Sequence, residues 1–332
     1  MNRRSFVGTA AATIAAARAG GIAGAAPTPS MTANASFGSL KAVDAGLLSV
    51  GYADVGPPDG RVVMLLHGWP YDIYSYVEVA PLLAARGYRV IVPYLRGFGT
   101  TQFRSSETMR NGEQVAFGLD TIALMDALKI DRAIVGGYDW GSRTAGILAA
   151  LWPQRCKALV AVSGYLIVNL TANQQPLPPR AELGWWYQYY FSTERGRLGY
   201  GQNLHDFNKL IWTLASPKWN FTDATYDRTA QSFQNPDHVA IVIHNYRWRL
   251  ELAQGDPQDA ALAEKLQQYP VITVPTITIA SDFDGAAASG EAYRKQFSGS
   301  YEHRILPGVG HNVPQEAPQA FAKAVVDADG FS

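Results

Sequence analysis

Short runs of apolar residues alternate with longer stretches of helical periodicity along most of the chain. The runs that predict strands lie at 47–56, 61–68, 88–95, 132–139 and 157–164. The stretches that predict helices lie at 71–87, 110–130 and 142–152. Strands that are apolar on both faces are typical of parallel sheets covered on both sides. The pattern therefore predicts an α/β protein with a mostly parallel sheet flanked by helices.

One long segment interrupts this alternation. From about 166 to 268 no strand is predicted, and the segment is rich in tryptophan and tyrosine. The alternation returns at 274–282, 290–299, 301–310 and 317–328. We therefore expect a core formed by residues 40–165 and 269–332, with a helical cap at 166–268 inserted into it. The cap should sit over the carboxyl edge of the sheet, where open α/β sheets place their sites.

Residues 1–30 differ in composition from the rest. The paired arginines Arg3 and Arg4 precede an alanine-rich stretch, and small residues precede Pro27. This layout is typical of a cleaved export signal, and the start RRSFVG resembles the twin-arginine type. We therefore expect a periplasmic or secreted protein; the alternative is a disordered alanine-rich tail. No later run reaches about 18 uncharged apolar residues, so no membrane span is expected.

The charge and cysteine content narrow the classes of partner. Lysine plus arginine and aspartate plus glutamate each number 28, so the net charge is zero. No basic run or zinc-ligand spacing is present, and we expect no nucleic-acid partner. Cys156 is the single cysteine, so no intrachain disulfide can form, and we expect a small buried apolar side chain there. Nothing in the sequence predicts the oligomeric state.

The segment GGYDWGS at 136–142 carries the first candidate chemistry. Asp139 stands between a predicted strand and a predicted helix, in the spacing Gly137-x-Asp139-x-Gly141. This is the nucleophile-elbow pattern, in which a strained turn exposes the central side chain and the glycines let strand and helix approach. The alternative is a glycine-rich turn with a helix-capping aspartate.

Partners for Asp139 follow later in the chain, in the order nucleophile, acid, histidine that the elbow fold uses. The strand at 274–282 leads to Asp282 and Asp284, and His311 follows the last predicted strand in a glycine-flanked turn. Carboxyl ends of parallel strands meet at one edge, so the three groups can converge. We take Asp284 as the acid because it lies further into the loop, with Asp282 as the alternative.

The motif His67-Gly68-Trp69-Pro70 follows another predicted strand. It resembles the His-Gly-x-Pro oxyanion loop of the same fold, although an ordinary strand-to-helix turn is the alternative. The backbone N–H groups of Trp69 and Trp140 are expected to point at one oxygen. His67 and Pro70 are expected to line the substrate pocket.

A carboxylate at the nucleophile position changes the expected reaction. It is ionised at neutral pH and can displace a leaving group at a saturated carbon without the help of a base. The product is an ester of Asp139, which water activated by His311 and Asp284 then hydrolyses. This chemistry indicates epoxide hydrolases and dehalogenases rather than serine esterases, and it requires no metal or cofactor.

From about residue 45 to its end, the sequence resembles the α/β-hydrolase-fold epoxide hydrolases. The resemblance is strongest at HGWP, at YDWG and in two cap segments, YQYYF and NYR. It implies that Tyr187 and Tyr246 of these segments donate hydrogen bonds to the epoxide oxygen. Tyr189 and Tyr190 are rivals of Tyr187, and packing within the cap is the alternative role of each tyrosine.

The sequence departs from this family at three positions. Tyr138 stands where histidine is usual, Tyr94 where an aspartate is common before Leu-Arg-Gly, and Ser281 where glycine is usual. None of these changes removes a predicted catalytic group. Together they indicate a divergent branch with its own substrate range.

Two other function classes remain as alternatives. Haloalkane dehalogenases hold the halide with the indole N–H of the tryptophan after the nucleophile, which would be Trp140. Fluoroacetate dehalogenases use two arginines, of which Arg143 matches one while Trp140 stands in the place of the other. A non-catalytic ligand-binding protein is the second class, although such proteins usually lose a triad member. We predict a hydrolase that opens a small, fairly apolar epoxide to a vicinal diol.

Overall fold

The computed structural model describes residues 36–331 of the chain. The predicted export signal at residues 1–30 lies outside the described residues, so export stays a prediction. Within the described part, no helix has both the length and the apolar character that crossing a membrane requires.

Within these residues, a nine-stranded sheet runs in the order β1-β2-β4-β3-β6-β7-β8-β9, and β5 pairs with β2. The pairs from β4 to β9 are parallel, whereas β2 is antiparallel to its neighbours. The strands are β1 (Lys41–Ala45), β2 (Leu48–Val55), β3 (Arg61–Leu66), β4 (Tyr88–Pro93), β5 (Gln102–Phe103), β6 (Ala133–Gly137), β7 (Cys156–Val162), β8 (Thr276–Ser281) and β9 (Tyr301–Leu306). The predicted mostly parallel sheet is therefore confirmed, while β1 and β5 were not predicted.

The register of the central strands positions the site. The chain places β4 on one side of β3 and β6 on the other, so the winding of the sheet reverses between β3 and β6. Parallel pairing sets Leu66 opposite Gly137, at the carboxyl ends of both strands. The loops that follow these two strands, with Trp69 and Asp139, thus emerge side by side at the switch point of the sheet, the usual place for a ligand.

Helices cover the sheet, and one of them differs from the prediction. The flanking helices are η1 (Ile73–Tyr76), α1 (Val79–Ala84), α2 (Gln114–Ala127), α3 (Trp140–Leu151), η2 (Pro153–Arg155), η5 (Asp282–Ser289), η6 (Glu291–Gln296), α12 (Val313–Glu316) and α13 (Pro318–Asp329). The stretch 71–87 was predicted as one helix but forms η1 and α1. Asp72 caps η1 by accepting from the Tyr74 N–H, and Pro81 has no N–H, so it fits only the first turn of a new helix.

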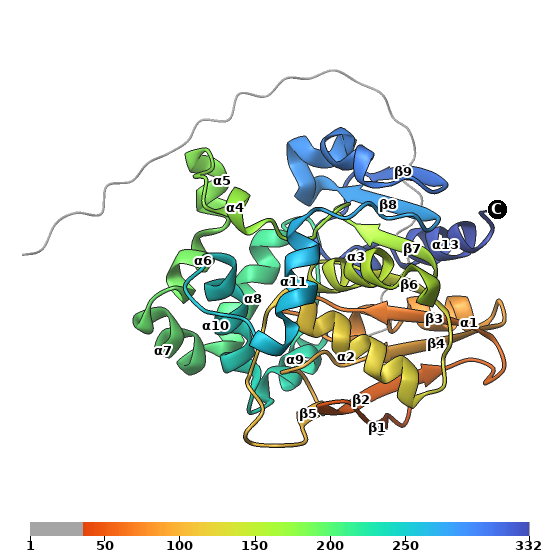
Figure 1. Cartoon of the computed structure of the whole chain (residues 1–332), viewed down its shortest axis with the longest axis horizontal. Coiled ribbons are helices and arrows are strands. Elements are labelled where there is room, and N and C mark those ends of the chain that lie inside the picture. Colours follow the sequence, from red (N-terminus) through yellow and green to blue (C-terminus); the bar gives the residue numbers. More distant parts are fainter. Residues whose placement is uncertain (1–35, 332) are drawn as a thin grey trace, which may run out of the picture. The chain divides into compact units, whose positions relative to one another are not determined.

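The insertion between β7 and β8 is helical throughout its ordered elements. These are α4 (Leu170–Asn173), α5 (Pro179–Gly184), α6 (Trp186–Phe191), α7 (Glu194–Gln202), α8 (Leu204–Ala215), α9 (Asp223–Ala230), η3 (Gln231–Gln234), α10 (His238–Arg249), η4 (Pro257–Asp259) and α11 (Ala260–Gln267). Figure 1 shows α6, α8 and α10 gathered beside the carboxyl ends of the parallel strands. Aromatic rings form the inner packing of this cap, as with Phe191 and Tyr200, whose centroids are 4.8 Å apart.

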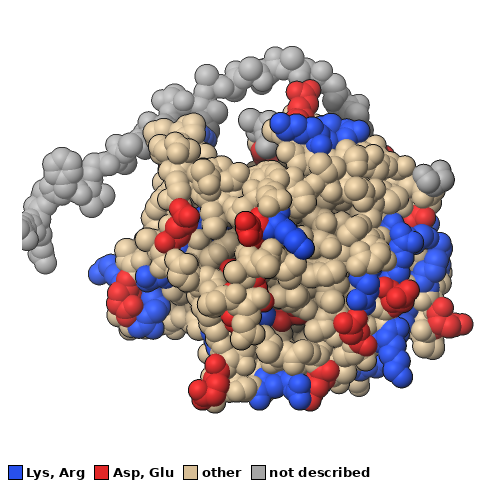
Figure 2. Space-filling model, viewed as in Figure 1, with Lys and Arg blue, Asp and Glu red and all other residues tan. Residues whose placement is uncertain are grey.

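The surface and the single thiol agree with the composition. On the face seen in Figure 2, basic and acidic side chains are interspersed and form no extended field of one sign. Cys156 begins β7 and is fully buried, which confirms the prediction of a small buried side chain. Burial raises the pKa of the Cys156 thiol to about 12, so this thiol stays protonated at neutral pH.

Candidate active site

The turn at Asp139 has the geometry of a nucleophile elbow. Asp139 directly precedes α3 with φ 52° and ψ −126°, a conformation that L-residues rarely adopt. A Cβ on Gly137 would lie 2.3 Å from the backbone of Gly141, and a Cβ on Gly141 would lie 1.8 Å from Leu66 O. Strand β6, helix α3 and strand β3 can pass this closely only because both positions are glycine.

The carboxylate of Asp139 lies between a backbone donor and the predicted histidine. Its Oδ1 accepts from the N–H of Trp69 at 2.8 Å, and its Oδ2 lies 3.3 Å from Nε2 of His311. Burial would raise the pKa of Asp139, but the His311 ring, Arg143 and the Trp69 N–H outweigh burial and hold the pKa below its ordinary value. The carboxylate is therefore ionised at neutral pH, as a nucleophile must be.

Arg143 supplies part of this electrostatic support from one turn into α3. It is buried, and its Nε donates to Leu166 O at 3.0 Å. Burial lowers the pKa of Arg143 to about 10, which leaves the guanidinium charged at neutral pH.

His311 is held firmly on one side of its ring and has no partner on the other. Its ring centroid lies 4.1 Å from that of Phe283. Its Nδ1, the atom that an orienting acid would accept from, is buried and has no hydrogen-bond partner among residues 36–331. The structure thus brings His311 to Asp139 but does not bring a carboxylate to Nδ1.

Both candidate acids make other contacts. Asp284, in η5, turns back so that its Oδ2 accepts from the N–H of Ser281 at 2.7 Å. Asp282 accepts from Lys218 at 2.6 Å and from the N–H of Gly308 at 3.0 Å, on the surface. The role predicted for Asp284 therefore has no hydrogen bond to support it in this conformation of η5.

A second carboxylate, which sequence reasoning missed, organises the backbone of the histidine turn. Glu316 of α12 accepts from the N–H of Gly310 at 2.7 Å, from the N–H of Asn312 at 3.0 Å and from the hydroxyl of Ser216 at 2.6 Å. The same Ser216 oxygen accepts from the N–H of His311 at 2.9 Å. The sequence feature that could have predicted this role is the position of Glu316, five residues after His311 and within reach of the same turn. Nothing in the sequence singles out Ser216, which follows α8 of the cap.

The oxyanion motif is present, but two of its members serve another purpose. His67 is fully buried, donates from Nδ1 to Gly68 O at 2.9 Å and accepts at Nε2 from the N–H of Leu95 at 3.1 Å. Burial lowers the pKa of His67 to about 4, so the ring is neutral and ties together the loops after β3 and β4. The carbonyl of Pro70 accepts from the Trp212 indole at 2.7 Å. Neither residue lines the cavity described below, and their role as pocket residues stays a prediction.

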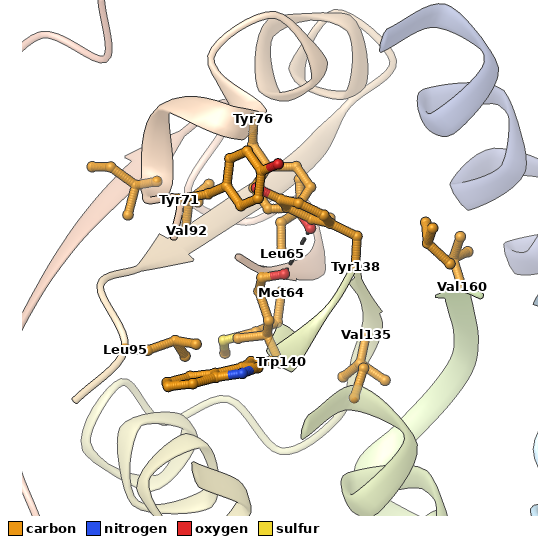
Figure 3. Close-up of a cluster of buried hydrophobic side chains, with 14 of the residues drawn as sticks. Met64, Leu65, Tyr71, Tyr76, Val92, Leu95, Val135, Tyr138, Trp140 and Val160 are labelled. Carbon is orange, nitrogen blue, oxygen red and sulfur yellow. Dashed lines mark hydrogen bonds between the residues drawn. The ribbon is translucent and has the colours of Figure 1, made fainter. Parts of the chain in front are cut away.

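The two residues that flank Asp139 point to opposite sides of the turn. Figure 3 shows Tyr138 turned toward Tyr71 and Tyr76, with Trp140 on the other side. The Tyr138 hydroxyl lies 2.5 Å from that of Ser75, inside the core. The Trp140 indole Nε1 is buried and has no hydrogen-bond partner among the described residues. The N–H of Trp140 stays a predicted second donor of the oxyanion hole.

The structure distinguishes the cap tyrosines from one another. Tyr187 and Tyr246 are buried, with ring centroids 5.4 Å apart and each 5.2 Å from the Trp69 ring. Burial and the nearby charge of Asp139 raise the pKa of Tyr187, so its hydroxyl stays protonated and can donate. Tyr189 is half exposed and bonds to Glu182, and Tyr190 stacks on Phe207. The two rivals of Tyr187 thus contact other residues, and neither is among the residues that line the cavity at Asp139.

An apolar cavity of about 620 Å³ opens onto Asp139. Asp139, His311, Trp69 and Tyr187 all line it, and Arg180 is a charged residue of its wall. Its apolar wall comes mainly from five residues of the cap, with Phe283 of η5 completing it; the five are Leu183, Trp185, Trp186, Ile211 and Leu214. Tyr246 and Trp140 lie behind this lining rather than in it. No group of three His, Cys, Asp or Glu residues in the described part of the chain could hold a metal ion.

The chain belongs to the α/β-hydrolase fold family, whose sequence profile matches residues 61–318. A crystal structure from Klebsiella pneumoniae subsp. pneumoniae MGH 78578, provisionally named an epoxide hydrolase, is 57% identical with a TM-score of 0.87, covering 90% of this chain and 100% of that one. Epoxide hydrolase B of Mycobacterium tuberculosis is 34% identical over 155 residues, which are 42% of this chain and 43% of that protein. A haloalkane dehalogenase of Psychrobacter cryohalolentis is 26% identical over 294 residues, 84% of this chain and 86% of that protein.

These similarities define an enzyme, an epoxide hydrolase-like α/β hydrolase. The matched segment spans less than half the length of the curated epoxide hydrolases of Mycobacterium tuberculosis. A dehalogenase matches over most of the chain at lower identity. The family and fold are thus established, and the leaving group is a question for the chemistry of the site.

Proposed function

We propose that this protein hydrolyses an apolar epoxide to a vicinal diol through a covalent ester of Asp139. The observation that carries the proposal is the placement of one ionised carboxylate between the Trp69 N–H and His311 Nε2, in a cavity that Tyr187 also lines. A carboxylate without an attached base suits attack on saturated carbon. A protonated phenol opposite it suits an oxygen leaving group that stays attached to the substrate.

The first step joins the substrate to the protein. The free Oδ2 lone pair of Asp139 attacks an epoxide carbon, and the bond from that carbon to the ring oxygen breaks. The oxygen takes a proton from Tyr187, with Tyr246 packed against it as the second predicted donor. The product is a β-hydroxyalkyl ester of Asp139, and one cap tyrosine is left as a phenolate.

The second step releases the diol. His311 Nε2 removes a proton from water, and the hydroxide attacks the Asp139 carbonyl carbon. The Trp69 N–H, and by prediction that of Trp140, stabilise the oxygen that becomes negative. Collapse expels the diol alkoxide and leaves Asp139 as the carboxylic acid. The proton of this acid and the proton on His311 then pass to the alkoxide and the phenolate, which regenerates the Asp139 carboxylate, neutral His311 and the protonated tyrosine. We propose that Asp284, next to Phe283 on the His311 ring, accepts from Nδ1 during this step.

The lining predicts the substrate class. Seven of the lining side chains are large and apolar, and the volume suits a molecule of drug-like size. We therefore propose a fairly apolar epoxide. A clear preference for small charged epoxides would contradict this.

One observation keeps haloalkane dehalogenation as a second candidate. The unpartnered indole N–H of Trp140 is a donor that a halide could use. Against it, Trp140 does not line the cavity that contains Asp139.

Intact-protein mass spectrometry of a His311→Gln variant tests the proposal. The variant should still form the ester but hydrolyse it slowly, so an adduct accumulates. Gain of a whole epoxide mass at Asp139 supports the proposal, whereas gain of an alkyl group from a haloalkane supports the second candidate. His205→Gln, an exposed cap histidine, is the matched control and should accumulate no adduct. A folded His311→Gln protein that gains no mass from any epoxide or haloalkane tested would refute both candidate functions.

A further inference from the structure

The side chain of Trp69 is anchored in a chain of hydrogen bonds that crosses from core to cap and back. Its indole Nε1 donates to the hydroxyl of Tyr200 at 2.8 Å, and this hydroxyl lies 2.8 Å from Nε2 of His238. Nδ1 of His238 lies 2.9 Å from the carbonyl of Gly97, in the loop after β4. Trp69, Tyr200 and His238 are all buried.

The chemistry of the end groups fixes where each proton lies. An indole N–H can only donate, and a carbonyl can only accept. His238 must therefore carry its proton on Nδ1 and accept at Nε2 from Tyr200, which in turn accepts from Trp69. Each of the three hydrogen bonds from Trp69 to Gly97 then has one donor and one acceptor, with no proton missing or in excess. Burial lowers the pKa of His238 to about 4, in agreement with this neutral ring.

Trp69 connects these hydrogen bonds to the residues of the candidate active site. Its backbone N–H donates to Asp139, and its ring lies 5.2 Å from both Tyr187 and Tyr246, centroid to centroid. A side chain held at its far end restricts the rotation of its own Cα and so the direction of its N–H. Releasing the indole would loosen the oxyanion donor without removing it.

We propose that Tyr200 and His238 are positioning residues for the oxyanion hole, holding the Trp69 N–H on the Asp139 oxygen that gains charge when the ester is hydrolysed. The inference rests on the proposed function, because the ester is the species on which this N–H acts. The N–H contacts one carboxylate oxygen before attack but must stabilise a full charge in the tetrahedral intermediate. Loss of its alignment should therefore slow hydrolysis more than ester formation.

Single-turnover kinetics of Tyr200→Phe tests the proposal. Removing a whole oxyanion donor costs about 10²–10³-fold, so misaligning one should slow ester hydrolysis by about tenfold or more. Ester formation should change little, so the covalent adduct should build up in the steady state. Tyr226→Phe is the matched control, because Tyr226 is equally buried in the cap and its hydroxyl donates to a backbone carbonyl, that of His205.

Two substitutions at His238 sharpen the test. His238→Gln keeps an acceptor for Tyr200 and should retain most of the hydrolysis rate, whereas His238→Leu removes the acceptor and should behave like Tyr200→Phe. The Trp69 indole N–H resonance, assigned with Trp69→Phe, reports the bond itself without substrate. It should shift in Tyr200→Phe and His238→Leu but not in Tyr226→Phe.

Each outcome decides between the inference and the function beneath it. Equal effects of Tyr200→Phe and Tyr226→Phe on hydrolysis, or equal slowing of both chemical steps by Tyr200→Phe, would overturn the positioning role while an ester in the wild type still supports the proposed function. If the folded His311→Gln variant never gains an ester, both the proposed function and this inference are refuted.

Discussion

The two loops that frame His311 are built to very different degrees of constraint. The turn of Asp139 is fixed by a paired strand on each side of β6, by glycines that admit no side chain, and by the bond from Trp69. The loop of Asp284 is a 3-10 stretch broken at Gly285, whose φ is 53°. Its carboxylate accepts from its own strand end rather than from His311.

The difference indicates which half of the site is preorganised. Asp139, the proposed nucleophile, is held by the Trp69 N–H, and Nε2 of His311 already lies 3.3 Å from its carboxylate. The acid must still meet Nδ1. We infer that ester formation uses a ready-made half of the site, whereas hydrolysis depends on the half that is less fixed.

The largest expected effect is at the fixed half. Asp139→Asn removes the nucleophile without changing the size of the side chain, and turnover should fall by on the order of 10⁴ or more, as for nucleophiles elsewhere. Product formation from a chromogenic epoxide measures this. The double variant Asp139→Asn/His311→Gln should form no adduct, and an adduct on it would place the nucleophile elsewhere.

A substitution of Asp284, in the less fixed half, should slow only one of the two chemical steps. Asp284→Asn should slow ester hydrolysis by on the order of 10²–10⁴, the range of orienting carboxylates in other triads, and leave ester formation nearly unchanged. Asp282→Asn is the control, since Asp282 pairs with Lys218 on the surface. Rapid quench followed by mass spectrometry separates the steps. A larger effect at Asp282 would exchange the two assignments.

Acid should weaken the fixed half through its neutral histidines. The folded pKa of His238 is about 4 against an ordinary 6.5, so between these values the unfolded chain binds a proton that the folded one refuses. Stability is therefore complete above about pH 6.5 and is lost as the pH falls, by up to about 3 kcal/mol at pH 4 for a shift of about 2.5 units.

The measurement is the difference in unfolding free energy between wild type and His238→Gln across this range. Taking a difference is necessary because burial also raises the pKa of Asp72 and of Glu113 to about 7, which favours the folded state as the pH falls. These groups are common to both proteins and cancel. A difference that does not change with pH would show that His238 has the same pKa in the folded and the unfolded chain.

The smallest effect is expected at the carboxylate behind the histidine turn. Glu316→Gln turns one acceptor oxygen into a donor, leaving the N–H of Gly310 or of Asn312 without its partner at a cost of about 1–3 kcal/mol. Ester hydrolysis should slow by roughly tenfold or less. Glu302→Gln, which loses a surface pair with Arg304, is the control and should be neutral. Equal rates of ester hydrolysis in the two variants would show that Glu316 has no role in this step.

The sequence predicted the fixed half better than the less fixed one, for a physical reason. The elbow, the parallel sheet and the place of His311 follow from strand periodicity and glycine spacing, which act locally. The hydrogen-bond partners of Asp284, Glu316 and Tyr200 depend on how loops and cap fold onto the core. The hydrogen bonds that tie the buried ring of His67 between two loops could not be predicted either, because a histidine beside an oxyanion motif resembles a pocket residue until its burial is known.

The glycines around Asp139 also limit which substitutions this turn can accept during evolution. A Cβ on Gly68 would lie 2.3 Å from the Cβ of Asp139, and Gly137 and Gly141 are equally closed to substitution. The positive φ at residue 139 disfavours branching at Cβ. A single amino-acid substitution can therefore exchange residue 139, the proposed nucleophile, among unbranched side chains such as aspartate, serine and cysteine, while the surrounding glycines stay the same. New reactions in this lineage would arise by changing that one side chain and the cap opposite it.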